Sequence, residues 1–390
     1  MGKLTIIKHV RVFDGQAVVG PKTVVIDGSD IGENELADDA DPSAVVVIDG
    51  TGCTLLPGLI DCHVHIRDEA QLAECASFGV TTVCDMACMP IDKYHKLRAA
   101  SVLGPTTWLS SSLPAYEENS RHGRLFKLGG FGPEYAVHDT DEAAKFVQNR
   151  VDEGVDYIKI VADHPGHEQA VLDKIQVEAK KHGKMTVAHT AHYAAFERGL
   201  RAGFDILTHV PMDRALDNNV VSQMTSQKTV AVPTLSMMEG MANSWVLWGL
   251  SWILPSFRRK TDFQNALDSV AAMRNAGVPI AAGTDTNNSG IFTVVAGKSL
   301  HHELELMVRA GLTPIEALRA ATSSAAQHFN LRDRGRISPG LRADIVLVDG
   351  KPDKDITATQ RISKIWSGGE EVPISSALGP NSNLGSCAVM

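Results

Sequence analysis

Short runs in which apolar and polar residues alternate mark both ends of the chain. They cover residues 4–13, 23–26, 45–48, 343–350 and 362–366. Alternation with a period of two is typical of strands that bury one face, and the Asp-Gly pairs that close the first three runs are common turns. Neither end has enough strands for a sheet of its own. We therefore expect the two ends to combine into one small β-sandwich.

Apolar runs and amphipathic segments alternate through the middle of the chain. The predicted strands cover residues 56–65, 80–86, 106–111, 155–162, 184–189, 205–210, 229–234 and 278–284. The predicted helices include residues 140–153, 168–182, 193–202 and 263–276. Eight β/α units within about 230 residues predict an α/β fold with a (β/α)8 TIM-type barrel. A doubly wound sheet is the alternative, but no glycine-rich phosphate loop follows the first strand.

These patterns divide the chain into three parts. Residues 1–55 and 335–370 form the composite β-sandwich, and residues 56–334 form the barrel. Residues 371–390 are rich in serine, glycine and asparagine, a composition that is typical of a flexible tail.

Composition and charge narrow the possible partners. The 390 residues carry a formal net charge of −9, which argues against nucleic acid as a ligand. No apolar run approaches the ~18–20 residues of a membrane helix. The N-terminal residues lack a signal-peptide pattern, and the six cysteines have neither zinc-finger nor disulfide-framework spacing. We expect a cytoplasmic protein that acts on a small molecule and forms a homo-oligomer.

The chain ends in a possible lipidation motif. Cys387 is followed by Ala-Val-Met, which fits the box for prenylation. No cluster of basic residues precedes it, and a single lipid gives only marginal membrane attachment. Modification of Cys387 would therefore add at most a weak membrane tether, and an unmodified tail is the alternative.

Two histidines at the end of the first barrel strand are the first candidate ligands. Side chains alternate along a strand, so His63 and His65 leave the same face. Two imidazoles side by side at the end of a buried strand suit a divalent metal ion. Two core histidines with hydrogen-bond partners in the protein are the alternative.

Later strands end in further side chains that can bind a metal. His189 closes the fifth strand, His209 the sixth and Asp285 the eighth. Lys159 points inward on the fourth strand, where burial would leave a neutral amine that can add CO2 to form a carbamate. Each alone has a structural alternative, such as a helix cap or an ion pair. Because the carboxyl ends of barrel strands converge, we expect these side chains to meet.

The motifs together resemble the amidohydrolase superfamily, and the resemblance covers residues 4–368. It is carried by Leu56–His65, Gly79–Val83, Tyr157–Lys159, His189, His209, Gly283–Asp285, Ala310–Thr322, Gly335–Ile337 and Ala343–Val346. The branch most similar is the imidazolonepropionase-like one, which includes Xaa-Pro dipeptidases, arginine carboxypeptidases and ochratoxin-hydrolysing amidases. Cys84-Asp85 stands where many relatives have an arginine, and His192-Tyr193 stands where relatives often have His-Gly. Both departures concern substrate specificity.

The resemblance implies a two-metal hydrolase. His63, His65 and Asp285 would hold one metal, and His189 and His209 the second, with carboxylated Lys159 as a bridge. Two metals can share a hydroxide that attacks an amide carbonyl, while Asp285 acts as proton shuttle. Zinc suits these ligands, and manganese, cobalt or nickel can occupy such a site.

The long β/α loops supply the predicted substrate contacts. Tyr116 and Arg124 lie in residues 112–139, and His192 and Tyr193 follow the fifth strand. His192 is either a substrate contact or the start of a helix. Trp245, Trp248 and Trp252 share one helix face, which either lines an apolar pocket around Trp248 or packs in a dimer contact.

The expected substrate is dipeptide-like or an N-acyl amino acid. A cyclic amide, lactone or ester, or a related metal-dependent step in specialised metabolism, is the alternative within the same fold. A catalytically inactive scaffold is the alternative from another class, but none of the six predicted ligands is missing.

Overall fold

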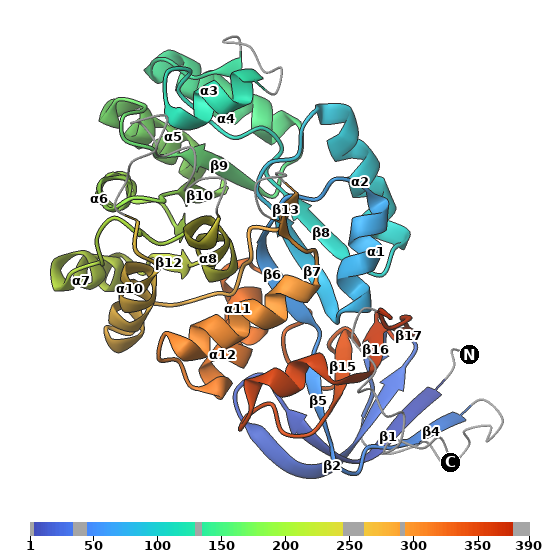
Figure 1. Cartoon of the computed structure of the whole chain (residues 1–390). Coiled ribbons are helices and arrows are strands. Elements are labelled where there is room, and N and C mark those ends of the chain that lie inside the picture. The colour runs from blue at the N-terminus through green and yellow to red at the C-terminus, as the bar shows by residue number, and fades with distance from the viewer. Residues whose placement is uncertain (1–3, 34–44, 129–134, 245–260, 289–292, 377–390) are drawn as a thin grey trace.

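The computed structural model describes residues 4–33, 45–128, 135–244, 261–288 and 293–376. Helices and parallel strands make up one part of the molecule, and a sheet built from both ends of the chain lies beside it (Figure 1). The largest hydrophobic cluster runs through both parts, from Phe13 and Leu56 to Ile365 and Val372. Burial of this continuous apolar surface is the main force that holds the two parts together.

One mixed sheet joins the two ends of the chain, as the alternating runs predict. Its main path has the order β17-β16-β15-β5-β1-β2-β3, and β4 pairs with β1. β5 pairs in parallel with β1 and antiparallel with β15, so the N-terminal and C-terminal strands meet there. The strands are β1 (Leu4–Phe13), β2 (Val18–Asp27), β3 (Asp30–Ile31), β4 (Val45–Asp49), β5 (Cys53–Pro57), β15 (Ile345–Asp349), β16 (Ile362–Ser367) and β17 (Glu370–Glu371).

The middle of the chain forms two sets of parallel strands. The first set is β6 (Leu59–Val64), β7 (Val80–Asp85) and β8 (Thr107–Ser110). The second set is β9 (Tyr157–Val161), β10 (Met185–His189), β11 (Ile206–Thr208) and β12 (Val230–Val232). A short hairpin, β13 (Asn287–Asn288) and β14 (Thr293–Val294), follows later in the chain.

Single backbone bridges join strands of the two sets to residues outside them. Ala115 bridges to Ile160, Ala231 to Ile280 and Val64 to Thr286, all in parallel. The eighth predicted strand, residues 278–284, forms one such bridge, at Ile280, but no continuous ladder in the described structure. The hydrogen bonds therefore show an α/β fold with parallel strands, and closure into a barrel stays a prediction.

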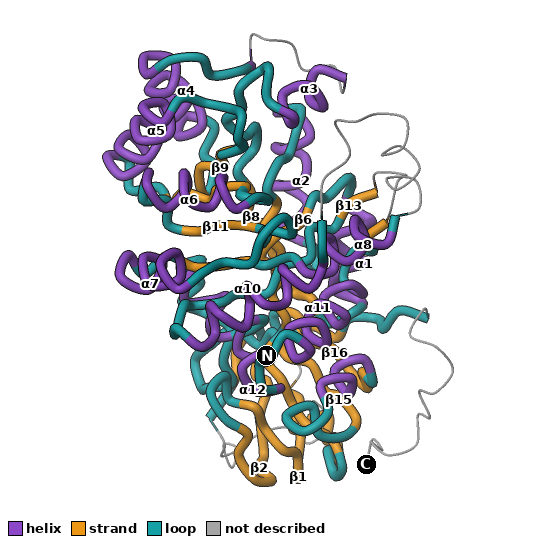
Figure 2. Tube along the Cα trace, turned by 60° about the vertical axis from the view of Figure 1, so that its left-hand side comes forward, coloured by secondary structure: helices purple, strands orange, loops and turns teal. Residues whose placement is uncertain are grey.

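Helices follow most of the parallel strands and lie around them (Figures 1 and 2). They are α1 (Glu69–Ser77), α2 (Ile91–Leu103), α3 (Arg121–Leu128), α4 (Thr140–Asp152), α5 (Gln169–Lys181), α6 (Tyr193–Ala202), α7 (Asn218–Gln227), α8 (Leu235–Asn243), α10 (Phe263–Asn275), α11 (Lys298–Arg309), α12 (Pro314–Ala320), α13 (Ser323–His328) and the 3-10 helix η4 (Ile356–Gln360). The four helices predicted by name are confirmed to within a residue. None of the described helices is both long and apolar enough to cross a membrane.

The prediction of one strand over residues 56–65 is wrong. The run divides at Gly58 into β5, which belongs to the mixed sheet, and β6, which pairs with β7. At the break, the Gly58 N–H donates to the Asp344 carbonyl at 2.6 Å. A Cβ atom on Gly58 would lie 2.2 Å from Thr81 Oγ1, so only glycine fits this close approach.

We predict that Gly58→Ala destabilises the protein, because the added methyl group overpacks a site that cannot widen without moving both sheets. The expected loss in the free energy of unfolding is about 1–3 kcal/mol, measured by urea denaturation. Gly20→Ala is the matched control, because a Cβ at Gly20 would meet nothing within 4 Å. Equal stability of the two variants would contradict the packing argument.

Candidate metal centre

Three of the predicted ligands meet where β6 ends. His63 lies within β6 and His65 just after it, and their rings are 5.4 Å apart. Nε2 of His63 is 3.6 Å from Asp285 Oδ1, and Nε2 of His65 is 3.1 Å from the same oxygen. The ligand atoms of these three residues all lie within 4.8 Å of one another. The structure therefore makes His63, His65 and Asp285 a candidate metal site.

A buried carboxylate beneath this site fixes two of its residues. Asp61 accepts hydrogen bonds from the hydroxyl and the backbone N–H of Thr284, at 2.7 and 3.0 Å, and from the N–H of His63 at 3.2 Å. In turn, the Asp285 N–H donates to the His63 carbonyl at 2.7 Å. Burial raises the pKa of Asp61 to about 7, although these hydrogen bonds oppose the shift.

Lys159 is buried in the same region and forms no ion pair with another of the described residues. Its side chain points toward β11, where Nζ lies 3.2 Å from Thr208 Oγ1. Burial lowers the pKa of this amine to about 7, whereas Asp285 opposes the shift. A substantial fraction of this amine is therefore neutral near pH 7, and the neutral amine is the form that can react with CO2.

The histidines at the ends of β10 and β11 complete the cluster. The His209 ring centroid lies 4.3 Å from that of His189 and 4.8 Å from that of His63. Burial, followed by neighbouring cationic groups, lowers the pKa of His63, His189 and His209 well below the usual value. Their imidazoles are therefore neutral at pH 7, which is the metal-binding form.

Two of these residues have a strained backbone. His209 has φ of 70° and Asp285 has φ of 58°, in the left-handed region that non-glycine residues rarely adopt. Such conformations cost about 1–3 kcal/mol each and concentrate at functional sites. Here His209, directly after β11, and Asp285 both adopt this conformation where their side chains enter the shared cluster.

His122 and Asp163 join the cluster, although the sequence reasoning did not propose them as ligands. His122 Nδ1 lies 2.6 Å from Asp163 Oδ2, and its ring lies 4.2 Å from the His189 ring. With His189 they form a second group of possible metal ligands. Asp163 stands just after β9, so the rule that strand ends carry functional groups would have found it. His122 lies on α3, and no comparable signal marks it.

The donor atoms of the second group fit a metal ion. Asp163 Oδ1 and His189 Nε2 are buried, have no hydrogen-bond partner among the described residues and lie 3.6 Å apart. Buried polar atoms are almost always satisfied, so such a pair calls for a bound partner. An ion at ordinary nitrogen and oxygen distances of about 2.0–2.2 Å can contact both.

The predicted substrate contacts are dispersed. Tyr116 is buried with its ring 4.7 Å from that of Phe126, and Arg124 is exposed on α3. His192 precedes α6 and lies near enough to Asp163 to lower the pKa of that carboxyl. The Tyr193 hydroxyl donates to Asp217 at 2.7 Å. Trp248, with Trp245 and Trp252, lies outside the described residues, as does Cys387.

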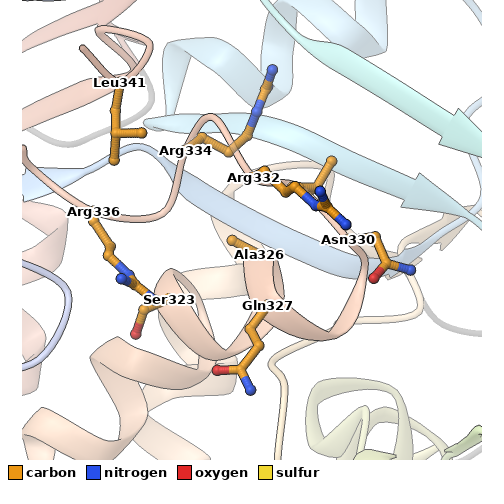
Figure 3. A pocket seen from close by; sticks show the side chains of 9 residues that line it. Ser323, Ala326, Gln327, Asn330, Arg332, Arg334, Arg336 and Leu341 are labelled. Carbon is orange, nitrogen blue, oxygen red and sulfur yellow. The ribbon is translucent and has the colours of Figure 1, made fainter.

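A cavity of about 320 Å³ lies elsewhere, between α13 and residues 330–341 (Figure 3). Arg332, Arg334 and Arg336 line it. The Arg334 guanidinium donates to Thr82, Thr107 and Asp344, so this arginine has a structural role. None of the predicted ligands lines this cavity, and we do not assign it to catalysis.

Comparisons with known proteins agree with the geometry. Residues 54–372 match the model described as "Amidohydrolase family". Ochratoxinase of Aspergillus niger is 25% identical over 376 residues, covering 81% of this chain and 75% of the relative. Imidazolonepropionase of Paracoccus denitrificans is 25% identical over 349 residues, with coverage of 78% and 82%. A Xaa-Pro dipeptidase crystallised with methionine in its active site has a TM-score of 0.79 at 22% identity, covering 94% of this chain and 99% of that one, and this likeness shows the fold alone.

We predict that Asp61→Asn weakens both the fold and the metal site, because the NH2 group would replace Oδ2, which accepts from the Thr284 hydroxyl, and the remaining amide oxygen is a neutral acceptor for the two N–H donors. Hydrogen bonds to a charged group are worth about 1.5–3 kcal/mol, so urea denaturation of the metal-free variant should show a loss of this size. Zinc content per chain should also fall. Asp14→Asn is the control, since Asp14 accepts two backbone N–H bonds in an exposed turn. Unchanged stability and zinc content in Asp61→Asn would contradict the assignment.

Proposed function

The chain belongs to the amidohydrolase family and is a metal-dependent hydrolase that acts on C–N bonds, and from this premise we propose that it hydrolyses an amide-type bond in a dipeptide-like or N-acyl amino acid substrate. On this proposal the centre holds two divalent metal ions. Zinc suits the mixed imidazole and carboxylate donors, and manganese, cobalt or nickel are compatible with them.

One observation carries the proposal: six ligand-competent side chains from distant parts of the sequence meet in one buried cluster. They are His63, His65, Lys159, His189, His209 and Asp285. We assign His63, His65 and Asp285 to one metal and His189 and His209 to the other, with carboxylated Lys159 as the bridge. Asp163 is a further candidate ligand of the second metal, or it orients His122 and His189.

The arrangement of the cluster also supports the predicted (β/α)8 barrel. The bridges extend the two sets beyond their ladders, because β9 bridges to Ala115 after β8, and β12 and β6 bridge to Ile280 and Thr286 of one later segment. A barrel would bring the carboxyl ends of all its strands together, which accounts for the meeting of the ligands. The mixed sheet supports our proposal that residues 1–55 and 335–370 form a small β-sandwich. We propose that residues 371–390 form a tail, of which Glu371 still pairs in β17 and Val372 still packs in the largest hydrophobic cluster.

When bound, the metal pair would activate a water molecule and polarise the scissile carbonyl. The chain supplies the proton chemistry. The Asp285 carboxyl oxygens lie within 4 Å of His63, His65 and His209, so this side chain can accept the proton of the attacking water and deliver it to the leaving nitrogen. The neutral imidazoles preserve the positive charge of the metals, while Asp285 and the Lys159 carbamate moderate it.

The names of similar proteins support the substrate class. Ochratoxinase and a Xaa-Pro dipeptidase occur among them, and a further solved relative is a prolidase bound to N-methylphosphonate-L-proline. We therefore propose a substrate with an amide next to an amino acid carboxylate. His192, Tyr193, Tyr116, Arg124 and Trp248 remain the proposed contacts for the rest of the substrate.

A substrate panel combined with metal analysis tests this function. Purified protein loaded with zinc should hold two ions per chain and should cleave Xaa-Pro dipeptides or N-acyl amino acids faster than lactones, cyclic amides or esters. The reverse preference would favour the alternative substrate class. Less than half an equivalent of metal, together with no hydrolysis in any class, would indicate an inactive scaffold.

We predict that Lys159→Ala abolishes activity and that short carboxylic acids partly restore it, because a small acid can replace the carbamate bridge. Activity is measured after metal removal and reloading with bicarbonate present. Lys184→Ala is the matched control, since the Lys184 amine donates to the Val155 backbone carbonyl and should be dispensable for catalysis. Full activity of Lys159→Ala would exclude the carbamate.

We predict that Asp285→Asn folds and keeps much of its metal but loses catalysis, since an amide cannot carry the proton. The expected fall in kcat is ~10²–10⁴-fold from the loss of acid–base catalysis alone, with a further loss from weaker ligation. Asp262→Asn, which alters the cap of α10, serves as the control. A fall of less than tenfold in Asp285→Asn would leave this residue a structural role only.

A further inference from the structure

Helix α8 begins beside the metal-ligand candidate His209. Thr234, the residue before α8, is completely buried, and its Oγ1 lies 2.8 Å from His209 Nδ1. When the Nδ1–H donates to this hydroxyl oxygen, the free lone pair of the imidazole is on Nε2. The hydroxyl of Thr234 thereby fixes both the ring orientation of His209 and the nitrogen that it offers to a metal.

Because the Thr234 hydroxyl contacts His209, it does not cap the N-terminus of α8. Thr234 has φ of 52° and ψ of 48°, and its side chain makes no capping hydrogen bond. Other helices of the chain cap themselves: Asp139 and Asp217 each accept two N–H bonds in the first turns of α4 and α7. The left-handed conformation is also unfavourable for a β-branched residue, so the start of α8 requires support from elsewhere.

Glu303 of α11 provides that support. Its Oε1 accepts from the Leu235 N–H at 2.8 Å and its Oε2 from the Ser236 N–H at 2.6 Å. The Glu303 side chain is completely buried, and no cationic side chain pairs with it in the part of the chain that the structure describes. Burial raises the pKa of Glu303 to about 8, whereas the two N–H bonds oppose this shift, and the N-terminus of a helix also favours the negative charge. Glu303 thus caps α8 from a neighbouring helix.

We propose that Glu303 is a positioning residue for His209, acting through Thr234. By capping α8, it holds Thr234 in its left-handed conformation and leaves the threonine hydroxyl free for the imidazole. The inference rests on the proposed function, in which His209 binds the second metal. Glu303 belongs to neither group of possible metal ligands. It would raise the affinity for the second metal only by holding His209 in place.

Zinc binding to the reconstituted full-length protein tests the proposal, measured by competition with a chromophoric chelator. Thr234→Val removes the hydroxyl but keeps the branched shape, whereas Thr234→Ser keeps the hydroxyl. Outer partners of metal ligands typically contribute about 10–100-fold to affinity. We expect Thr234→Val and Glu303→Gln to weaken the second zinc by this factor, with the first zinc unchanged and with near wild-type affinity in Thr234→Ser.

Thr359→Val is the matched control. Thr359 Oγ1 lies 3.0 Å from Nδ1 of His301, in an equally buried threonine–histidine pair whose histidine is not a ligand candidate. This variant should bind both zinc ions as the wild type does. An equal loss of the second zinc in Thr359→Val would show a general effect of core disruption and would overturn the proposal.

A double variant separates positioning from general stability. If Glu303 acts through Thr234, Glu303→Gln adds no further loss of zinc affinity in the Thr234→Val background, and additive losses would overturn that route. Should Glu303→Gln fail to fold, the Thr234→Val and Thr234→Ser pair still decides: unchanged affinity in Thr234→Val overturns the proposal. A wild-type protein that binds no second zinc would overturn the proposed function as well, which distinguishes the two failures.

Discussion

The carboxylate of Asp61 joins two segments that are 223 residues apart in the chain. Through Thr284 on one side and His63 on the other, it sets the distance between ligand candidates that no local structure could relate. The segments also approach so closely that a Cβ at Gly283 would lie 2.9 Å from the backbone nitrogen of His63. Asp61 is itself buried, so its hydrogen bonds cannot be replaced by water and the register of the two segments is strongly fixed.

The sequence predicted the features that follow from the spacing of apolar residues and from the position of polar residues at strand ends. Strand and helix periodicity placed the elements, and the rule that functional groups follow strand ends located His189, His209 and Asp285 in one cluster. The division at Gly58 escaped prediction because an apolar run does not reveal which sheet each half joins. The run looks continuous, and only the contact between Gly58 and Thr81 shows why it must divide.

Residues outside the strands were the least predictable part of the centre. His122 reaches the cluster from α3, and Glu303 reaches α8 from α11. Neither residue has a characteristic position within its own element, and each acquires its partner only through packing of distant helices. The roles of such residues depend on tertiary contacts, which the sequence pattern does not show. Ligands at strand ends can be predicted, because hydrophobic periodicity shows where a strand ends.

The mixed sheet pairs strands that the ribosome synthesises at different times. A ribosome releases β5 early, but β15, which pairs with β5 along its whole length, emerges only with residues 345–349. The Gly58 N–H likewise has no acceptor in the Asp344 carbonyl until residue 344 has been synthesised. Because β6 with His63 starts one residue beyond this junction, the strand that carries the first histidine adjoins a sheet whose pairing needs residues 344–349.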